Sequence, residues 1–473
     1  MNALYEKYAE YRRFVDDVYR GTCEVKSKEK AKIYLPPHPS EIGHEDRYRS
    51  RFHLTHFENA FRPIIDAIVG IMQKCPATVQ FGVESDEESP KEVRDLEVYG
   101  NAQNDGLSGL KRRLNFAQAL FGRAGLLLGI EDGAERNRPK FVIREYAADK
   151  ILDGEQGKWA LLDESTDTFD SVTKKRKIET RWRVIALDGQ GWYYTCPIVG
   201  ELADVQKAWE NFDLFAPPSE AVYPTFRGQL LDVLPLTVCN AKTIGFDGLE
   251  EPPYYDAAQA VIDAYNSDSF YRRAIANHAT PTVVVSNAKQ LVDKNGKEIP
   301  LEVGGVFWLD GAGTVPADVK LIQASSDGLN AMKQSKDDIL DGFKRISIQD
   351  LLDRAGANSS GDAIQLRMMS GTATIAEIDH AGGKAIEEQL CYAAYWAGAT
   401  WEEVGERISY KVDIAYAKTD FMLSEVVNLM MANANLKLFA PQVLYELIRL
   451  KAPGVMPEWE DNLAQMQAVQ EEL

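Results

Sequence analysis

The chain has 473 residues, of which 45% are hydrophobic, and its formal net charge is −19. This length allows roughly two to four structural units with ample core. The acidic balance argues against a DNA-binding regulator, because tight binding to DNA needs clustered Lys and Arg. No apolar run approaches the ~20 residues of a membrane span. The first residues lack the apolar core of a signal peptide, so export is not expected. The five cysteines are widely spaced and are expected to be reduced thiols.

The N-terminal part of the chain begins with helical patterns. Apolar residues at helical spacing predict an amphipathic helix over 3–20. A Pro-rich connector follows at 33–41. The capping-box pattern Thr55–Glu58 then predicts the start of an apolar helix that runs to Met72. Pro63 falls inside this stretch, where it would kink the helix or shift its start.

The next region changes from helical to β-rich patterning. A strand is predicted at 77–83, a second capping box begins at Ser89, and a helix covers 109–121. β-branched and aromatic runs predict five further strands, with a hairpin turn at 188–191 between the last two. These five strands are expected at 125–131, 141–146, 159–164, 178–187 and 192–199.

Two helices separated by a β-rich insert follow. A helix is predicted over 256–278, because its apolar residues are spaced helically and prolines stand on both sides. The insert, 279–325, contains strand patterns at 280–286 and 299–309 around a turn at 293–296. Helical spacing returns over 326–348.

The C-terminal part begins with a small, polar loop at 349–362. A helix is then predicted to about Gly398, and the pair Gly382–Gly383 inside it is expected to produce a kink. A strand is predicted at 410–415. Three helices should follow, beginning at Thr419, Pro441 and Pro457.

Several stretches, taken in order along the chain, resemble tailed-bacteriophage portal proteins, which form the head-to-tail connector. The stretches are YLPPHPSE at 34–41, FENAFRPIIDAIVGIMQKCP at 57–76, PPYYD at 252–256, SGTATIAEIDHAGG at 370–383 and 439–457. The order of helix, β insert, helix, loop and long helix is also that of this family. None of these stretches carries chemistry, so the resemblance depends on pattern.

The resemblance implies an α+β portal fold with named parts. Residues 1–255 would form an α/β wing, 256–278 and 326–348 the two stem helices, and 279–325 a small β clip between them. The tunnel loop would be 349–362, the wing's long kinked helix and its return 363–425, and a helical crown 426–473.

The resemblance also implies a function and partners. The chain would form a ring, with twelve copies expected, at one vertex of a virion capsid, after assembly in the host cytoplasm. Double-stranded DNA would pass through the channel during packaging and ejection. The ring would bind the large terminase, a head–tail adaptor, and the major capsid and scaffolding proteins. Two alternatives to the portal function are another ring-forming virion connector or tail protein, and an enzyme with an unrecognised active site.

Candidate functional residues follow from these parts. Lys333, Lys336, Lys344 and Arg345 are candidates for charges that face DNA, and intersubunit salt bridges are an equal alternative. Reversing the charges of Lys333 and Lys336 should then affect DNA passage more than folding. Asn358, Ser359 and Ser360 are candidates for contact with DNA in the tunnel loop, or belong to an exposed linker. In the clip, the candidates for the adaptor interface are Val303, Phe307 and Trp308, for which core packing is the alternative.

Signatures of catalysis and metal binding are weak. The chain has neither a P-loop nor a GxSxG elbow. His53 and His56, with Glu58 nearby, could begin a metal site, but a third ligand at suitable spacing is missing. The acidic pairs Asp337–Asp338 and Glu387–Glu388 are interpreted as solvated or intersubunit faces. We therefore expect no catalytic residues, metal or cofactor, and a ring this acidic would repel the phosphates of DNA on average.

Overall fold

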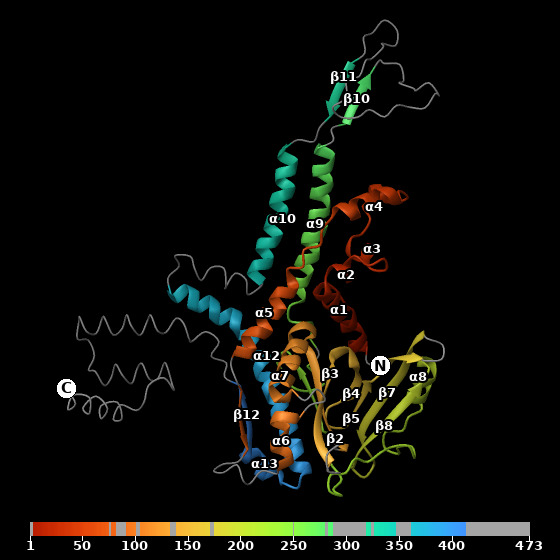
Figure 1. The fold of residues 1–473 in the computed structure, drawn as a ribbon, viewed down its shortest axis with the longest axis vertical. Coiled ribbons are helices and arrows are strands. Elements are labelled where there is room, and N and C mark those ends of the chain that lie inside the picture. Colours follow the sequence, from red (N-terminus) through yellow and green to blue (C-terminus); the bar gives the residue numbers. More distant parts are fainter. Residues whose placement is uncertain are drawn as a thin grey trace, which may run out of the picture.

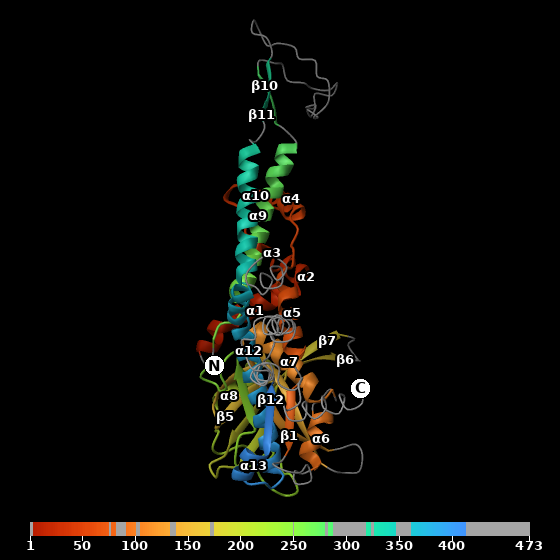
Figure 2. The ribbon, with the colours of Figure 1, turned by 90° about the vertical axis from the view of Figure 1, so that its left-hand side faces the viewer.

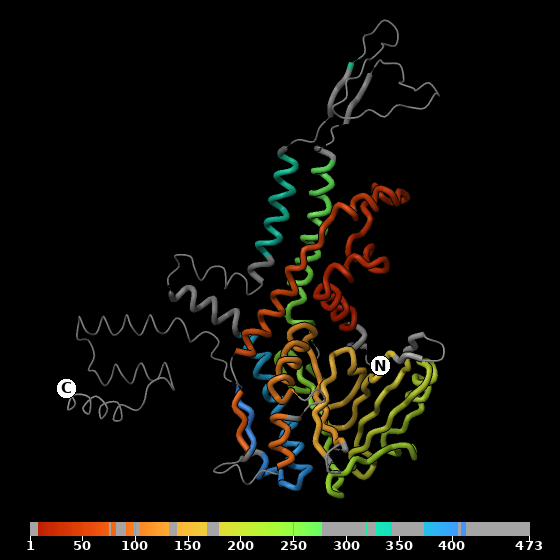
Figure 3. Tube along the Cα trace, viewed as in Figure 1, coloured from red at the N-terminus to blue at the C-terminus, as the bar shows by residue number. Residues whose placement is uncertain are grey.

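The structure is a computed structural model with a mixed α+β fold, as predicted. It describes residues 3–74, 77–81, 91–100, 105–132, 139–170, 175–248, 250–279, 282–286, 318–322, 326–346 and 361–412. A body of sheets and helices carries a pair of long helices that projects along the longest axis of the molecule (Figure 1). Figure 3 follows the same path as a trace from the N-terminal helices to the body and the projecting pair.

The helical side of the body is built around one long helix. The predicted helix over 362–398 is confirmed as α12 (Gly361–Trp396), which packs against α7 (Gly106–Phe121). Apolar side chains of α1 (Ala3–Arg20) and α5 (Phe61–Lys74) join α7 and α12 in one buried core. The shorter helices α6 (Lys91–Tyr99) and α13 (Trp401–Arg407) also contact α12, and their buried side chains belong to a second core beside the sheet.

A three-stranded antiparallel sheet lies against α12. Its order is β3 (Pro139–Ala147), β2 (Arg123–Asp132) and β9 (Leu236–Asn240). The strand β9 was not predicted, because all five of its residues are buried and an apolar run without alternation resembles a buried helix segment. The other two strands of this sheet, β2 and β3, confirm the strands predicted at 125–131 and 141–146.

A second antiparallel sheet forms the outer side of the body. Four of its strands lie in the order β4 (Ile151–Glu155), β5 (Trp159–Asp163), β7 (Lys175–Leu187) and β6 (Thr166–Asp170). The fifth strand, β8 (Tyr193–Gly200), also pairs with the long strand β7. The predicted turn at 188–191 is confirmed, since Leu187 pairs with Tyr193 across it. Helix α8 (Leu202–Glu210) was not predicted and packs beside β8.

A strand pair joins segments that are far apart in the sequence. β1 (Ala77–Phe81) pairs antiparallel with β12 (Ile408–Val412), so that Ala77 lies opposite Val412. This confirms the two predicted strands and brings the end of the described chain back to the body. The helices predicted from Thr419 onward lie outside the described residues.

The projecting pair is an antiparallel helical hairpin. Helices α9 (Tyr255–Ala279) and α10 (Ser326–Ile346) lie side by side and confirm the predictions over 256–278 and 326–348. Beyond their far ends, β10 (Thr282–Ser286) pairs antiparallel with β11 (Asp318–Ile322) (Figures 1 and 2). The sequence pattern predicted β10 but not β11. The turn at 293–296 and the strand at 299–309 lie outside the described residues.

A segment that we call the arm, residues 22–54, lies beside α9. It contains α2 (Thr22–Val25), α3 (Ala31–Tyr34), the single turn η1 (Pro39–Glu41) and α4 (Glu45–Leu54). The helix α4 was not predicted, and the connector at 33–41 is partly helical.

The predicted helix start at Thr55 is wrong. Helix α4 ends at Leu54, and the Thr55 hydroxyl donates a hydrogen bond to the carbonyl of Arg51 at 2.7 Å. Thr55 therefore ends one helix instead of beginning the next. Helix α5 begins at Phe61, so Pro63 lies in its first turn, where a missing N–H costs no helical hydrogen bond.

The glycines in α12 allow close packing. The helix is continuous through Gly382 and Gly383. A Cβ at Gly382 would lie 2.7 Å from Asn115 Oδ1 and 2.8 Å from Gln118 Oε1, and one at Gly383 would lie 2.6 Å from a methyl of Val412. The kink expected at this pair stays a prediction, and the structure adds close contacts of the two glycines with α7 and β12.

We expect Gly382→Ala to lower the melting temperature, although alanine favours helix by about 1 kcal/mol over glycine. The amides of Asn115 and Gln118 are buried and hydrogen-bonded, so they cannot easily move away from a new methyl group. The matched control is Gly342→Ala in α10, where nothing lies within 4 Å of the new Cβ. Thermal unfolding should show a higher or unchanged melting temperature for the control. Stabilisation by both changes would contradict the packing role.

Candidate functional site on the helical hairpin

Helix α9 has partners on two sides. Helix α10 lies along one side of it, and the arm lies along the other (Figures 1 and 2). The first turns of α9 are rooted in the body, where Ala257, Val261 and Ile262 are buried together with side chains of α1 and α5. The hairpin is therefore a fixed projection of the body and not a separate unit.

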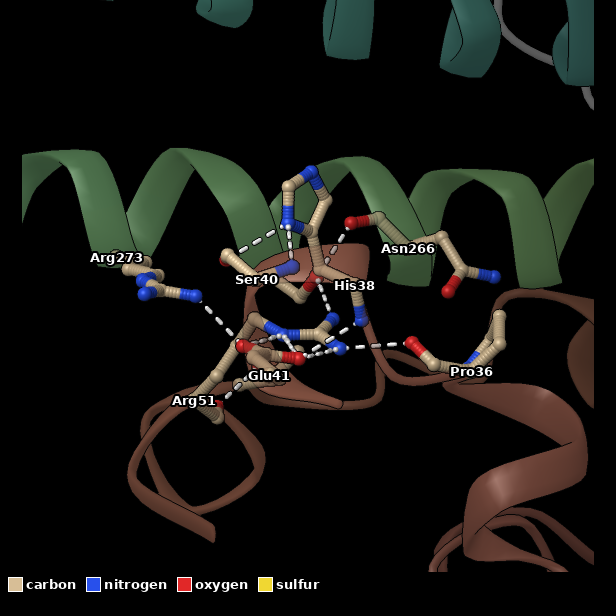
Figure 4. A network of polar contacts seen from close by, with 9 residues as sticks. Pro36, His38, Ser40, Glu41, Arg51, Asn266 and Arg273 are labelled. Carbon is tan, nitrogen blue, oxygen red and sulfur yellow. Dashed lines mark hydrogen bonds and ion pairs between the residues drawn. The ribbon is translucent and has the colours of Figure 1, made fainter. Parts of the chain in front are cut away.

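A buried ion pair within the arm is hydrogen-bonded to α9 (Figure 4). The side chains of Arg51 and Glu41 are both fully buried, with Nε–Oε1 and Nη2–Oε2 distances of 2.9 Å. Arg51 also donates to the Ser269 hydroxyl of α9 at 2.9 Å and to the Pro36 carbonyl at 2.8 Å. Arg273 of α9 donates to Glu41 Oε1 at 2.6 Å. The arm and the helix thus share one hydrogen-bond network.

The environment of Glu41 keeps its carboxylate charged. Burial alone would raise the pKa of Glu41, but hydrogen bonds from Arg51 and from the His38 N–H, with the charges of Arg51 and Arg273, lower it below its ordinary value. A lowered pKa means that this carboxylate stabilises the fold at neutral pH. That contribution is lost as the pH falls below the ordinary carboxyl range and through the lowered pKa.

A second ion pair joins the two helices of the hairpin. Lys336 of α10 donates to Asp268 Oδ1 of α9 at 2.7 Å, and Arg272 donates to Oδ2 of the same carboxylate. The Asp268 side chain is buried. Burial would raise the pKa of Asp268, but hydrogen bonds from Lys336 and Arg272 lower it.

This second pair changes the interpretation of the lysines on α10. Lys336 has a partner within its own chain, so it supports the hairpin and is not a free charge. Lys333 is exposed. Lys344 and Arg345 lie in the last turns of α10, and their side chains are outside the described part of the structure. Asn358, Ser359, Ser360, Val303, Phe307 and Trp308 also lie outside it.

Sequence patterns did not identify the residues that hold the hairpin. Arg51, Glu41 and Ser269 come from three separate segments, so no local spacing relates them. Asp268 and Arg272 are an i, i+4 pair on one helix face, which is a visible signal, but the third member, Lys336, is 64 residues further along.

The acidic pairs differ in their surroundings. Asp337 and Asp338 on α10 are exposed, as predicted for a solvated or intersubunit face. Glu387 and Glu388 are half-buried, and the prediction does not hold for them. Glu388 accepts a hydrogen bond from Thr237 at 2.9 Å, and Glu387 accepts one from the Tyr410 N–H at 2.7 Å. They connect α12 to β9 and β12.

The histidine pattern does not form a metal site. His53 belongs to α4, whereas His56 follows the end of that helix, so the two do not share a helical face as expected. Among the residues that the structure describes, no three His, Cys, Asp or Glu side chains gather to hold a metal ion. None of the described helices combines the length and hydropathy needed to cross a membrane.

We expect Arg51→Ala to lower the free energy of unfolding by about 3–5 kcal/mol, because it leaves Glu41 buried without its bidentate partner. The double variant Arg51→Met/Glu41→Leu should lose less than Arg51→Ala, since it removes both charges. Chemical denaturation would measure both values. A double variant that is less stable than Arg51→Ala would contradict this account of the pair.

The two lysines of α10 should respond differently to charge reversal, which revises the expectation from sequence. Lys336→Glu places a carboxylate beside Asp268 and should cost about 3 kcal/mol of stability. Lys333→Glu changes an exposed residue and should stay within about 0.5 kcal/mol. Chemical denaturation of the two variants in parallel tests this, and equal losses would contradict it.

Comparison with known proteins yields limited likenesses. No protein-family profile matches the chain, and no curated protein matches it. Solved structures that are similar to it include the neck of an empty GTA particle computed with C6 symmetry and the neck of a native GTA particle computed with C12 symmetry. Each has 12% sequence identity to this chain and a TM-score of 0.39. Both matches cover 84% of this chain, and they cover 90% of the chain from the empty particle and 89% of the chain from the native particle. A TM-score of 0.39 does not establish a shared fold, so neither structure assigns a function to this chain.

Proposed function

We propose that this protein is the portal subunit of a phage-like virion, and that copies of it form a ring around a DNA channel at one capsid vertex. The observation that supports this most is the helical hairpin, which projects from the α+β body with a small β pair beyond its end. The sequence resemblance to portal proteins along the chain supports the same proposal. In this assignment α9 and α10 are the stem, and β10 and β11 belong to the clip.

The shape of one subunit supports assembly. An isolated two-stranded β pair is marginally stable in water, and β10 and β11 pair with no third strand among the described residues. Neighbouring copies in a cyclic ring would bring more strands to this pair and cover more of each hairpin. The hairpin is long and narrow, so it gains more buried surface from neighbours than a compact domain does.

The charge of the chain is compatible with a conduit for DNA. A net charge of −19 per copy would keep DNA from binding tightly to the ring, and a sliding polymer needs only sparse cationic contacts. Within this proposal Lys333, Lys344, Arg345 and the loop residues 358–360 are the candidates for those contacts. Lys336 is not among these candidates, because its ammonium group is bound to Asp268 within the same copy.

The remaining parts of the proposal concern partners. The clip would present Val303, Phe307 and Trp308 to the head–tail adaptor, and it would also dock the large terminase. The capsid and scaffolding proteins would contact the ring at the vertex. The ring itself does no chemistry in this proposal, so it needs no cofactor, and a separate motor would hydrolyse ATP.

The proposal is tested by the mass of the purified protein in solution. A portal ring should give a species of about twelve times 52.9 kDa, and electron images should show a ring with a central hole. A species between monomer and tetramer without a hole would favour an enzyme and overturn the proposal. A ring that fails to bind terminase would favour another virion connector.

A further inference from the structure

Two adjoining grooves lie on the surface where helices α1, α5 and α7 come together (Figure 1). One groove, of about 620 Å³, lies between α5 and α7, and the other, of about 780 Å³, lies between α1 and residues 147–152. Tyr19 and Phe116 line both grooves, and their rings are in edge contact with centroids 5.3 Å apart. Volumes of this size are typical of binding sites. We call the two together the basic groove, because of the charges that line them.

The lining is basic, whereas the chain as a whole is acidic. Seven cationic and three acidic side chains line the basic groove, a net charge of +4 in a chain whose total is −19. Arg12 is buried. Four of the cations pair with acids of the same copy, namely Arg20, Arg62, Arg113 and Lys150. Arg13 and Arg112 are exposed, and neither forms an ion pair within the part of the chain that the structure describes. These two charges are available to a partner.

The basic groove also presents apolar surface. Phe116, Phe121 and Leu152 line it and are only half-buried. Gly70 of α5 is exposed beside them, and nothing lies within 4 Å of a Cβ added there, so the surface is open to close approach. A ligand that combines negative charge with an apolar stripe would match both features of the groove.

The helix predicted from Pro457 has this combination. Residues 457–473 contain five acidic residues and neither Lys nor Arg. One face of such a helix would carry Trp459, Leu463, Met466, Val469 and Leu473, and the acids would lie outside this face. The 44 residues between Val412 and this helix are enough chain to reach across the body.

We propose that the acidic helix 457–473 binds in the basic groove, with its apolar face on Phe116, Phe121 and Leu152 and its acids near Arg13 and Arg112. Recognition of this type places an amphipathic helix in a groove, where apolar anchors supply affinity and charges select the partner. The helix would then pack on the wing instead of joining the crown expected from the sequence. The proposal goes beyond the portal function and does not depend on a ring.

Hydrogen exchange of the full-length chain tests this contact. An isolated helix of 17 residues is marginal in water, so slow exchange of the amides of 457–473 reports docking. We expect slow exchange in the wild type and rates at least tenfold higher in Arg13→Glu/Arg112→Glu. Reversing the acids instead, in Glu458→Arg/Glu460→Arg/Asp461→Arg, should have the same effect. Combining the two sets should restore protection, because opposite charges would face each other again.

Matched controls separate docking from general effects of charge. Lys91→Glu/Lys207→Glu reverses two exposed cations of α6 and α8, outside the groove, and should leave the exchange of 457–473 unchanged. Leu463→Ser/Met466→Ser removes part of the apolar face without changing the charge, and should raise the exchange rates. Both sets of changes in 457–473 leave the groove intact, so they test the contact even where the groove variant does not fold.

The outcomes separate this contact from the portal proposal. Fast exchange of 457–473 in the wild type, or slow exchange that survives the reversal of Arg13 and Arg112, would overturn the contact. If added DNA protected α1, α5 and α7 while 457–473 still exchanged fast, the groove would be a site for nucleic acid and the contact would be overturned. A chain that forms no ring but shows the expected exchange would overturn the portal proposal and leave the contact standing.

Discussion

The buried pair of Arg51 and Glu41 is the interaction on which the shape of the protruding part depends. Two full charges without exposed surface are tolerated only where geometry and hydrogen bonds compensate their lost hydration. Here the compensating hydrogen bonds come from the arm and from α9, since Ser269 and Arg273 of α9 complete the network. The arm therefore has one defined position on α9. This constraint fixes which surfaces of the hairpin are covered within a copy and which remain for other molecules.

Sequence patterns predicted the hairpin well, for a physical reason. Helices α9 and α10 have apolar residues at regular spacing, and prolines bound α9 on both sides, so local signals and packing agree. Where the local sequence signals and the packing disagreed, the prediction failed. Thr55–Glu58 matches a capping box, yet the chain uses Thr55 to end α4. The strand β9 is buried throughout and so shows no alternation.

The polar residues of the candidate site were less predictable than the helices. Charge alone placed Lys336 among residues that could face DNA, whereas its ion pair with Asp268 makes it part of the contact between the two helices. Such pairs form between residues remote in sequence, so they depend on how the helices pack and cannot be found from spacing. Lys333, three residues away, keeps its exposed position. A difference of one helical turn thus separates a structural charge from an exposed one.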